Sequence, residues 1–293
     1  MSSVEKPKEK KYDLLAIDDA FVDRFYQCSS DHITDHGLTL DNSVIYTQAQ
    51  VDPVIDGLKL QLEMSGGSAA NTATHMQNFG DRTAFYGMLG SGKNADLFRK
   101  DIQKSGVALH EIPSNKQDAT GCCTVLVDPE GNRSMMTSLP EEISIAPEDF
   151  EEEVLRDTKI TYIPAYRWSA TTRDAFLHAF KTTREAGGKA AFGLAAPFAV
   201  ERCQKDIRKM IEESKLDILF GNQEEFATLF PEKNPDDLGA IQAALIGLTR
   251  SYGNKPPKCE TVVYTMGKKG AVIFHKGSDY PIKAVPVEKV LDT

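Results

Sequence analysis

The chain of 293 residues is 41% hydrophobic, enough for one large globular domain or two small ones, and it carries a formal net charge of −9. This acidic balance argues against a general nucleic-acid partner, and no apolar run is long enough to span a membrane. Residues 1–11 are rich in lysine and glutamate, unlike a signal peptide, and the five cysteines lack metal-site spacing. We therefore expect a cytoplasmic protein with reduced thiols.

The first predicted strand, residues 12–17, ends in a cluster of carboxylates. Asp18 and Asp19 follow it directly, and Asp23 lies four residues further on. Ligands of open α/β sheets bind beyond the carboxyl ends of the strands, so these acids suit a ligand crevice. Solvated loop acids explain the pattern as well, and from local chemistry alone they are the preferred explanation. Residues 24–60 then alternate apolar and polar positions, with no strong helical period before about Asp52.

Residues 65–73 form a predicted turn that leads directly into a helix. Gly66 and Gly67 allow backbone angles that a side chain forbids and let a ligand lie against the main chain, while Ser68 is a natural N-cap. Asn71 is directed back towards the glycines, because side chains lean towards the N-terminus of a helix. The pattern predicts a polar ligand pocket, although a helix start with nothing bound is the alternative.

Residues 83–89 predict a buried strand that is followed by a helix. Between them, residues 87–94 (Gly-Met-Leu-Gly-Ser-Gly-Lys-Asn) have the spacing of a P-loop. Asn94 stands where a hydroxyl group should bind magnesium. A P-loop-type nucleotide site through Gly87–Lys93 is therefore an alternative hypothesis.

Residues 119–138 hold two β-rich runs around a turn at residues 128–132, so they predict a hairpin. Arg133 follows the turn, and a surface hairpin cation explains it. From residue 147 onwards helices and strands alternate. Helices are predicted at 147–156, 171–186, 200–214 and 223–230, and strands at 160–164, 188–194, 217–220, 260–266 and 271–275. Repeated units of this kind predict an α/β fold with a mainly parallel sheet and helices on both faces.

Two further segments place polar groups next to the ends of predicted strands. Asn222 and Glu225 begin a helix with the spacing of a capping box, which also sets an amide and a carboxylate on one helix face. Thr265, Gly267 and Gly270 lie in or beside a glycine turn, and an ordinary hairpin explains those glycines equally well.

Taken in order, these segments resemble the ribokinase/pfkB carbohydrate-kinase family, and within it the adenosine-kinase-like branch. The most specific segment is Gly66-Gly67-Ser-Ala-Ala-Asn71-Thr. The resemblance implies a single ribokinase-like α/β domain over residues 1–293 with a small β lid, formed by segments of approximately 24–50 and 119–138. The double glycine would be the hinge of that lid.

The resemblance also implies a substrate site. Its residues would be Asp19, Asp23, Gly66, Gly67, Asn71 and Arg133. Asp23 matches an aspartate of the family that binds two sugar hydroxyls with its two oxygens. Asn71 would contact the sugar hydroxyls, and Arg133 would lie near the phosphate-accepting end of the substrate. Asp18-Asp19 replaces the glycine and asparagine that are usual in the family.

The resemblance implies that the second substrate is ATP, bound together with Mg²⁺. The cofactor-binding residues would be Asn222, Glu225, Thr265, Gly267 and Gly270, with Glu225 holding the metal through water. The implied reaction transfers a phosphoryl group from ATP to a sugar hydroxymethyl and depends on positioning, a metal ion, an anion hole and an aspartate base. The family's Asp-Thr-x-Gly-Ala-Gly-Asp motif would begin at Asp292-Thr293. No residue is therefore assigned as the base, and the chain as given is expected to be truncated before it and inactive.

We expect an ATP-dependent phosphotransferase that acts on a nucleoside or sugar, with an adenosine-like substrate favoured. Ribose and ketodeoxygluconate stay open as substrates, and a homo-oligomer is compatible with the sequence. The alternative is a catalytically inactive family member that serves as a ligand-binding or regulatory partner.

Overall fold

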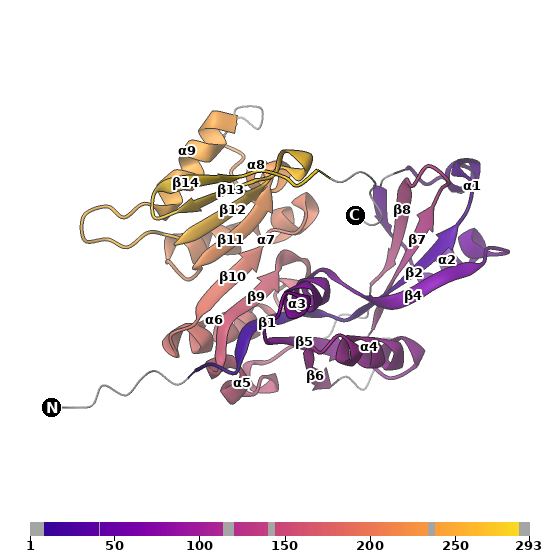
Figure 1. Ribbon diagram of the computed structural model, residues 1–293, viewed down its shortest axis with the longest axis horizontal. Helices are drawn as coiled ribbons and strands as arrows, with labels where there is room; N and C mark the ends of the chain where they lie inside the picture. The colour runs from indigo at the N-terminus through magenta and orange to yellow at the C-terminus, as the bar shows by residue number, and fades with distance from the viewer. Residues whose placement is uncertain (1–8, 41, 114–119, 140–143, 234–237, 287–293) are drawn as a thin grey trace. The chain divides into compact units, whose positions relative to one another are not determined.

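The computed structural model describes residues 9–40, 42–113, 120–139, 144–233 and 238–286 (Figure 1). The chain divides into two compact units. Unit 1 combines Met1–Lys11 with Ala146–Thr293, and unit 2 is Tyr12–Ile145. None of the helices in the described ranges is long and apolar enough to cross a membrane.

Unit 2 begins with a parallel arrangement of three strands. β5 (Thr83–Leu89) pairs with both β1 (Tyr12–Asp19) and β6 (Ala108–Pro113). The predicted strands at 12–17 and 83–89 are confirmed, and β1 runs on through Asp18 and Asp19. The helices α3 (Ser68–Asn78) and α4 (Lys93–Lys104) follow the pattern expected from the sequence. β1 and β5 are buried along nearly their whole length, which suits the apolar runs that predicted them.

The second sheet of unit 2 has five strands in the order β3-β8-β7-β2-β4. Their bounds are β2 (Phe21–Gln27), β3 (Asn42–Ile45), β4 (Leu60–Gly66), β7 (Gly121–Val127) and β8 (Arg133–Ser138). β7 and β8 form the predicted hairpin, with an antiparallel register that pairs Val127 with Arg133. Asp128 closes the turn by accepting hydrogen bonds from the backbone N–H groups of Glu130 (3.0 Å) and Asn132 (2.8 Å).

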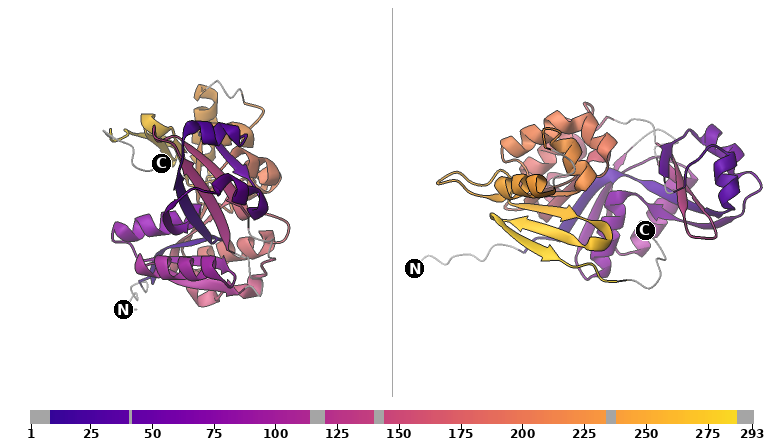
Figure 2. Two further views of the ribbon diagram at one scale, coloured as in Figure 1. Left: turned by 90° about the vertical axis from the view of Figure 1, so that its right-hand side faces the viewer. Right: turned by 90° about the horizontal axis from the view of Figure 1, so that it is seen from above.

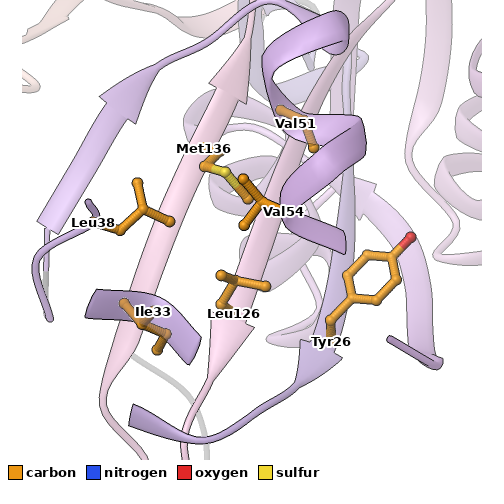
Figure 3. Close-up of a cluster of buried hydrophobic side chains, with 7 residues drawn as sticks. All are labelled: Tyr26, Ile33, Leu38, Val51, Val54, Leu126 and Met136. Atoms are coloured by element: carbon orange, nitrogen blue, oxygen red, sulfur yellow. The ribbon is translucent and has the colours of Figure 1, made fainter. Parts of the chain in front are cut away.

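Two short helices cover one face of this five-stranded sheet, α1 (Ser30–Asp35) and α2 (Gln48–Ile55). A buried apolar cluster joins them to the strands, as Figure 3 shows. Its members are Tyr26, Ile33, Leu38, Val51, Val54, Leu126 and Met136. Both helices begin before Asp52, in a segment whose sequence shows no strong helical period. Caps explain the earlier starts, because Ser29 accepts a hydrogen bond from the His32 N–H and Thr47 forms a capping box with Gln50.

Unit 1 contains strands in the order β14-β13-β12-β11-β10-β9. β9 to β12 are parallel, whereas β13 and β14 run antiparallel to their neighbours. The bounds are β9 (Thr158–Pro164), β10 (Lys189–Gly193), β11 (Ile218–Asn222), β12 (Thr261–Thr265), β13 (Ala271–His275) and β14 (Ser278–Ile282). The predicted strands of this half are confirmed, and β14 is an addition to them.

The α-helices of unit 1 are α5 (Glu152–Arg156), α6 (Arg173–Glu185), α7 (Pro197–Glu212), α8 (Gln223–Leu229) and α9 (Leu238–Thr249). The 3₁₀ turns are η1 (Pro147–Asp149), η2 (Ala165–Arg167) and η3 (Gly267–Lys269). The helix predicted at 147–156 is in fact η1 followed by α5. α9, which the sequence did not predict, packs along β12, β13 and β14 (Figure 2).

Candidate functional site

Most of the residues expected to bind a sugar lie close together in unit 2, at the end of β1, the start of β2 and the end of β4. Asp23 lies in β2, which pairs antiparallel with β4, and the register sets Phe21 opposite Gly66. A Cβ atom at Gly66 would overlap the carboxylate group of Asp23. A larger residue at Gly66 would therefore have to displace the Asp23 side chain.

Gly67 is constrained by its backbone conformation. It is the N-cap of α3 with φ of 96°, in the left-handed region that favours glycine. The expectation that Ser68 caps the helix is wrong, since Ser68 is the first helical residue and its backbone C=O accepts a bond from the Thr72 hydroxyl at 2.9 Å. Asn71 is exposed in the first turn and donates its backbone N–H to the Gly67 carbonyl at 2.9 Å.

Asp18 and Asp19 lie at the carboxyl end of β1 and are both buried. The Asp19 N–H donates to Asp18 Oδ1 at 2.9 Å. A Cβ atom at Gly67 would lie 3.5 Å from the Asp19 carbonyl oxygen, so the end of β1 is next to the glycine turn. The structure therefore brings Asp19, Asp23 and the two glycines together, with Asn71 one helical turn away.

Arg133 lies along the same sheet, away from the Asp23 and Gly66 contact. It pairs with Val127 at the turn of the hairpin, whereas Asp23 aligns with Cys123. Arg133 thus projects from the same face of the sheet as Asp23, but four residues further along the strands. Its role towards a substrate stays a prediction.

A pocket of about 450 Å³ lies beside the same sheet and was not predicted from the sequence. Its walls include Gln48, Gln50, Asn94 and Cys122, and none of its described lining residues carries a charged side chain. Because Cys123 aligns with Asp23, the neighbouring Cys122 side chain points to the opposite face from Asp23. This pocket therefore stands apart from the Asp23 carboxylate.

The P-loop hypothesis for Gly87–Lys93 fails on geometry. Gly87 lies within β5, where a Cβ atom would overlap the ring of Phe85. Only Gly90–Gly92 remain between β5 and α4, and the Gly90 N–H already donates to the Thr120 hydroxyl at 3.3 Å. A P-loop needs a longer loop whose N–H groups are directed at phosphate.

In unit 1 the expected nucleotide residues lie at the carboxyl ends of β11 and β12. Asn222 is the N-cap of α8 and forms a reciprocal capping box with Glu225. Glu225 Oε2 accepts from the Asn222 N–H (3.0 Å) and Oε1 from Asn222 Nδ2 (2.8 Å), while Asn222 Oδ1 accepts from the Glu225 N–H (3.0 Å). The capping interpretation is confirmed.

Glu225 is 7% exposed, and burial raises the pKa of its carboxyl group while the hydrogen bond from the Asn222 backbone opposes that shift. Its oxygens are the kind of ligand that Mg²⁺ prefers, and each keeps a lone pair beyond its bond to Asn222. The pair therefore fits a metal held through water. Within the described ranges, no group of three or more His, Cys, Asp or Glu is placed to hold a metal ion directly.

Thr265 stands directly beside this pair, because the parallel register sets it opposite Asn222. The chain then turns through Gly267, with φ of 53°, and Gly270, with φ of 95°. A Cβ atom at Gly270 would overlap the backbone carbonyl of Ile282 in β14, so this glycine serves the sheet itself. The structure brings Asn222, Glu225 and Thr265 together, with the glycine turn following at once. The motif expected from residue 292 lies outside the described residues.

Comparison with known proteins gives one consistent picture. A model of the pfkB family carbohydrate kinases matches residues 45–293. The adenosine kinase of Schizosaccharomyces pombe is 20% identical over 295 residues, which cover 96% of this chain and 84% of that protein.

Two solved structures are similar along nearly the whole chain. The probable sugar kinase protein from Rhizobium etli CFN 42 superposes with a TM-score of 0.83 and 26% identity, covering 97% of this chain and 82% of that one. The adenosine kinase from Sinorhizobium meliloti superposes with a TM-score of 0.82 and 26% identity, covering 97% and 83%. The predicted ribokinase-like α/β fold is confirmed.

Proposed function

This chain belongs to the pfkB family of carbohydrate kinases, and we propose that its substrate is a nucleoside of the adenosine type, phosphorylated on its hydroxymethyl group by ATP. The observation that carries the proposal is the Asp23 carboxylate set against Gly66, beside the Asp19 end of β1. A carboxylate held this way offers two acceptor oxygens to two neighbouring hydroxyl groups. Similarity to adenosine kinases supports a nucleoside, and the probable sugar kinase, at the same 26% identity, makes a free sugar the second candidate.

In the proposed complex the residues of this chain bind and orient the two substrates. Asp23 would accept hydrogen bonds from two sugar hydroxyls, and Asn71 would contact the sugar from the first turn of α3. Asn222 and Glu225 would hold Mg²⁺ through water, and the metal would neutralise charge on the ATP phosphates. Thr265 and the Gly267 turn would lie against the phosphates.

Binding is the property that the first test of this proposal measures. That this polypeptide lacks turnover stays a prediction, as do a cytoplasmic location and a homo-oligomeric state. A ligand present at a hundred times its dissociation constant stabilises a protein by about 2.7 kcal/mol, which a melting curve detects easily.

The experiment is a thermal-shift panel of adenosine, ribose and 2′,3′-dideoxyadenosine. Adenosine should raise the melting temperature most, and dideoxyadenosine, which lacks the hydroxyl pair, should raise it far less. Equal shifts with adenosine and dideoxyadenosine would show that the hydroxyl pair is not recognised. A shift with ribose but none with adenosine would reassign the substrate to a free sugar.

A further inference from the structure

Arg24 connects several elements on the face of the five-stranded sheet that is opposite Asp23. It follows Asp23 in β2, so the two side chains point to opposite faces. Arg24 Nε donates to Glu63 Oε2 at 2.7 Å, Nη2 donates to Asn94 Oδ1 at 2.6 Å, and Nη1 donates to Cys122 Sγ at 3.4 Å. Glu63 lies in β4, Cys122 in β7 and Asn94 in α4. One guanidinium group therefore joins β2 to both neighbouring strands and to a helix.

The same helix holds β4 at a second point. Asp101 of α4 accepts hydrogen bonds from Ser65, at 2.8 Å from the backbone N–H and 2.9 Å from the hydroxyl group. Asn94 and Asp101 are seven residues apart, close to two helical turns, so they lie on one side of α4. The adjacent side carries the buried Ala95, Phe98 and Ile102, which fix α4 in the core.

These two attachments flank the expected sugar site in sequence. Arg24 follows Asp23, and Ser65 precedes Gly66, the glycine whose Cβ position the Asp23 carboxylate occupies. We propose that Arg24 and Asp101 are positioning residues, which fasten β2 and β4 to α4 so that Asp23 stays against Gly66 in the geometry that binds the sugar. This inference rests on the proposed function, because a sugar is the ligand for which Asp23 is positioned.

The chemistry of Arg24 suits a fixed connection. Its side chain is 22% exposed and that of Glu63 29%, so water competes only partly for their charge-assisted hydrogen bond. Burial lowers the pKa of Arg24, but the hydrogen bond to Glu63 raises it, and the net direction is upward. A guanidinium group donates in several directions from one plane, which a lysine ammonium group cannot reproduce.

The test centres on two substitutions of Asn94, the residue of α4 that accepts from Arg24. Asn94→Ala removes the acceptor for Arg24, whereas Asn94→Asp keeps an acceptor in nearly the same shape. Arg82→Gln is the matched control, because it breaks the contact between Arg82 and Asp13 (3.1 Å), which lies outside the five-stranded sheet. Two readouts are compared at equal temperature: hydrogen exchange of the amides of residues 21–27 and 60–66, and the dissociation constant of adenosine by calorimetry.

We expect Asn94→Ala to speed exchange in both strands and to weaken adenosine binding, each by about tenfold, the scale of one lost hydrogen bond to a charged group. Asn94→Asp should restore both values, and Arg82→Gln should change neither. Asp101→Ala should act like Asn94→Ala in β4. Faster exchange with unchanged affinity would overturn the positioning role, and so would unchanged exchange.

The two proposals fail differently in this experiment. If the parent chain binds neither adenosine nor ribose, the proposed function fails. The attachment of both strands to α4 is then judged by exchange alone, and failure of Asn94→Ala to loosen β2 and β4 would overturn it.

Discussion

Replacing Gly66 with alanine tests the contact on which the site depends. The new Cβ atom would overlap the Asp23 carboxylate, so the carboxylate must rotate away or the strands must separate. Gly66 is not among the positive-φ glycines, so steric overlap alone carries the effect. Overpacking costs about 1–3 kcal/mol of folding free energy if the strands separate, and less if the half-buried Asp23 side chain rotates. Loss of the Asp23 contact to a sugar should cost a further amount of about 1–3 kcal/mol in binding.

Urea unfolding measures the loss of folding free energy, and calorimetric titration with adenosine measures the loss of binding free energy. Gly247→Ala is the matched control, because Gly247 lies in α9 with open space around its Cβ position. That change should leave binding intact and stabilise the helix by up to about 1 kcal/mol.

A double variant shows whether Asp23 transmits the effect. Gly66→Ala combined with Asp23→Ala should recover most of the lost folding stability, since the smaller side chain vacates the space. Additive losses in the double variant would refute the contact. A Gly66→Ala protein that matches the parent in both stability and adenosine affinity would refute it as well.

Further predictions concern unit 1. Tyr264→Phe should keep the free energy of unfolding or raise it by up to about 1 kcal/mol. The reason is that the Tyr264 hydroxyl is fully buried with no hydrogen-bond partner among the described residues. A clearly lower free energy of unfolding in urea would reveal a partner. Burial raises the folded-state pKa of Glu225 above its ordinary 4.5. Between pH 4.5 and the raised pKa, the folded protein keeps a proton that the unfolded chain has released. The free energy of unfolding should therefore fall as pH rises through this interval. Glu225→Gln should abolish that fall, because glutamine cannot ionise yet still closes the capping box, and an unchanged pH profile would contradict this. The same variant should weaken the thermal shift given by Mg²⁺ with ATP, whereas an equal loss of melting temperature with and without Mg²⁺-ATP would leave only the capping role.

The sequence predicted those elements whose pattern reflects local burial. The alternation of helix and strand after residue 147 was read correctly because each buried strand is a short apolar run bounded by helices. α9 escaped prediction because Leu238–Thr249 is apolar almost all round and contains two glycines, so no helical period stands out. β14 was not predicted because Ser278–Ile282 is exposed along its length and has no alternating pattern.

In the candidate site too, features set by local spacing were predictable and features set by long-range pairing were not. Asp23 and Gly66 were selected from their motifs, but their contact depends on the pairing of β2 with β4, which brings together residues 43 positions apart. Arg24 and Asn94 gave no signal because a hydrogen bond between side chains 70 residues apart leaves no local pattern. The Asn222–Glu225 capping box was predictable, since its spacing fixes its geometry within one helical turn.

The most direct test of the central claim is the coupling between Asp23 and the sugar hydroxyls. The dissociation constants of adenosine and 2′,3′-dideoxyadenosine are measured by calorimetry for the parent, for Asp23→Asn and for the control Asp96→Asn, whose side chain is 78% exposed on α4. We predict that Asp23→Asn weakens adenosine by about 1–3 kcal/mol, that it changes dideoxyadenosine little, and that Asp96→Asn changes neither. Equal losses for both ligands, or no loss for adenosine, would contradict the assignment of Asp23 as the residue that binds the sugar.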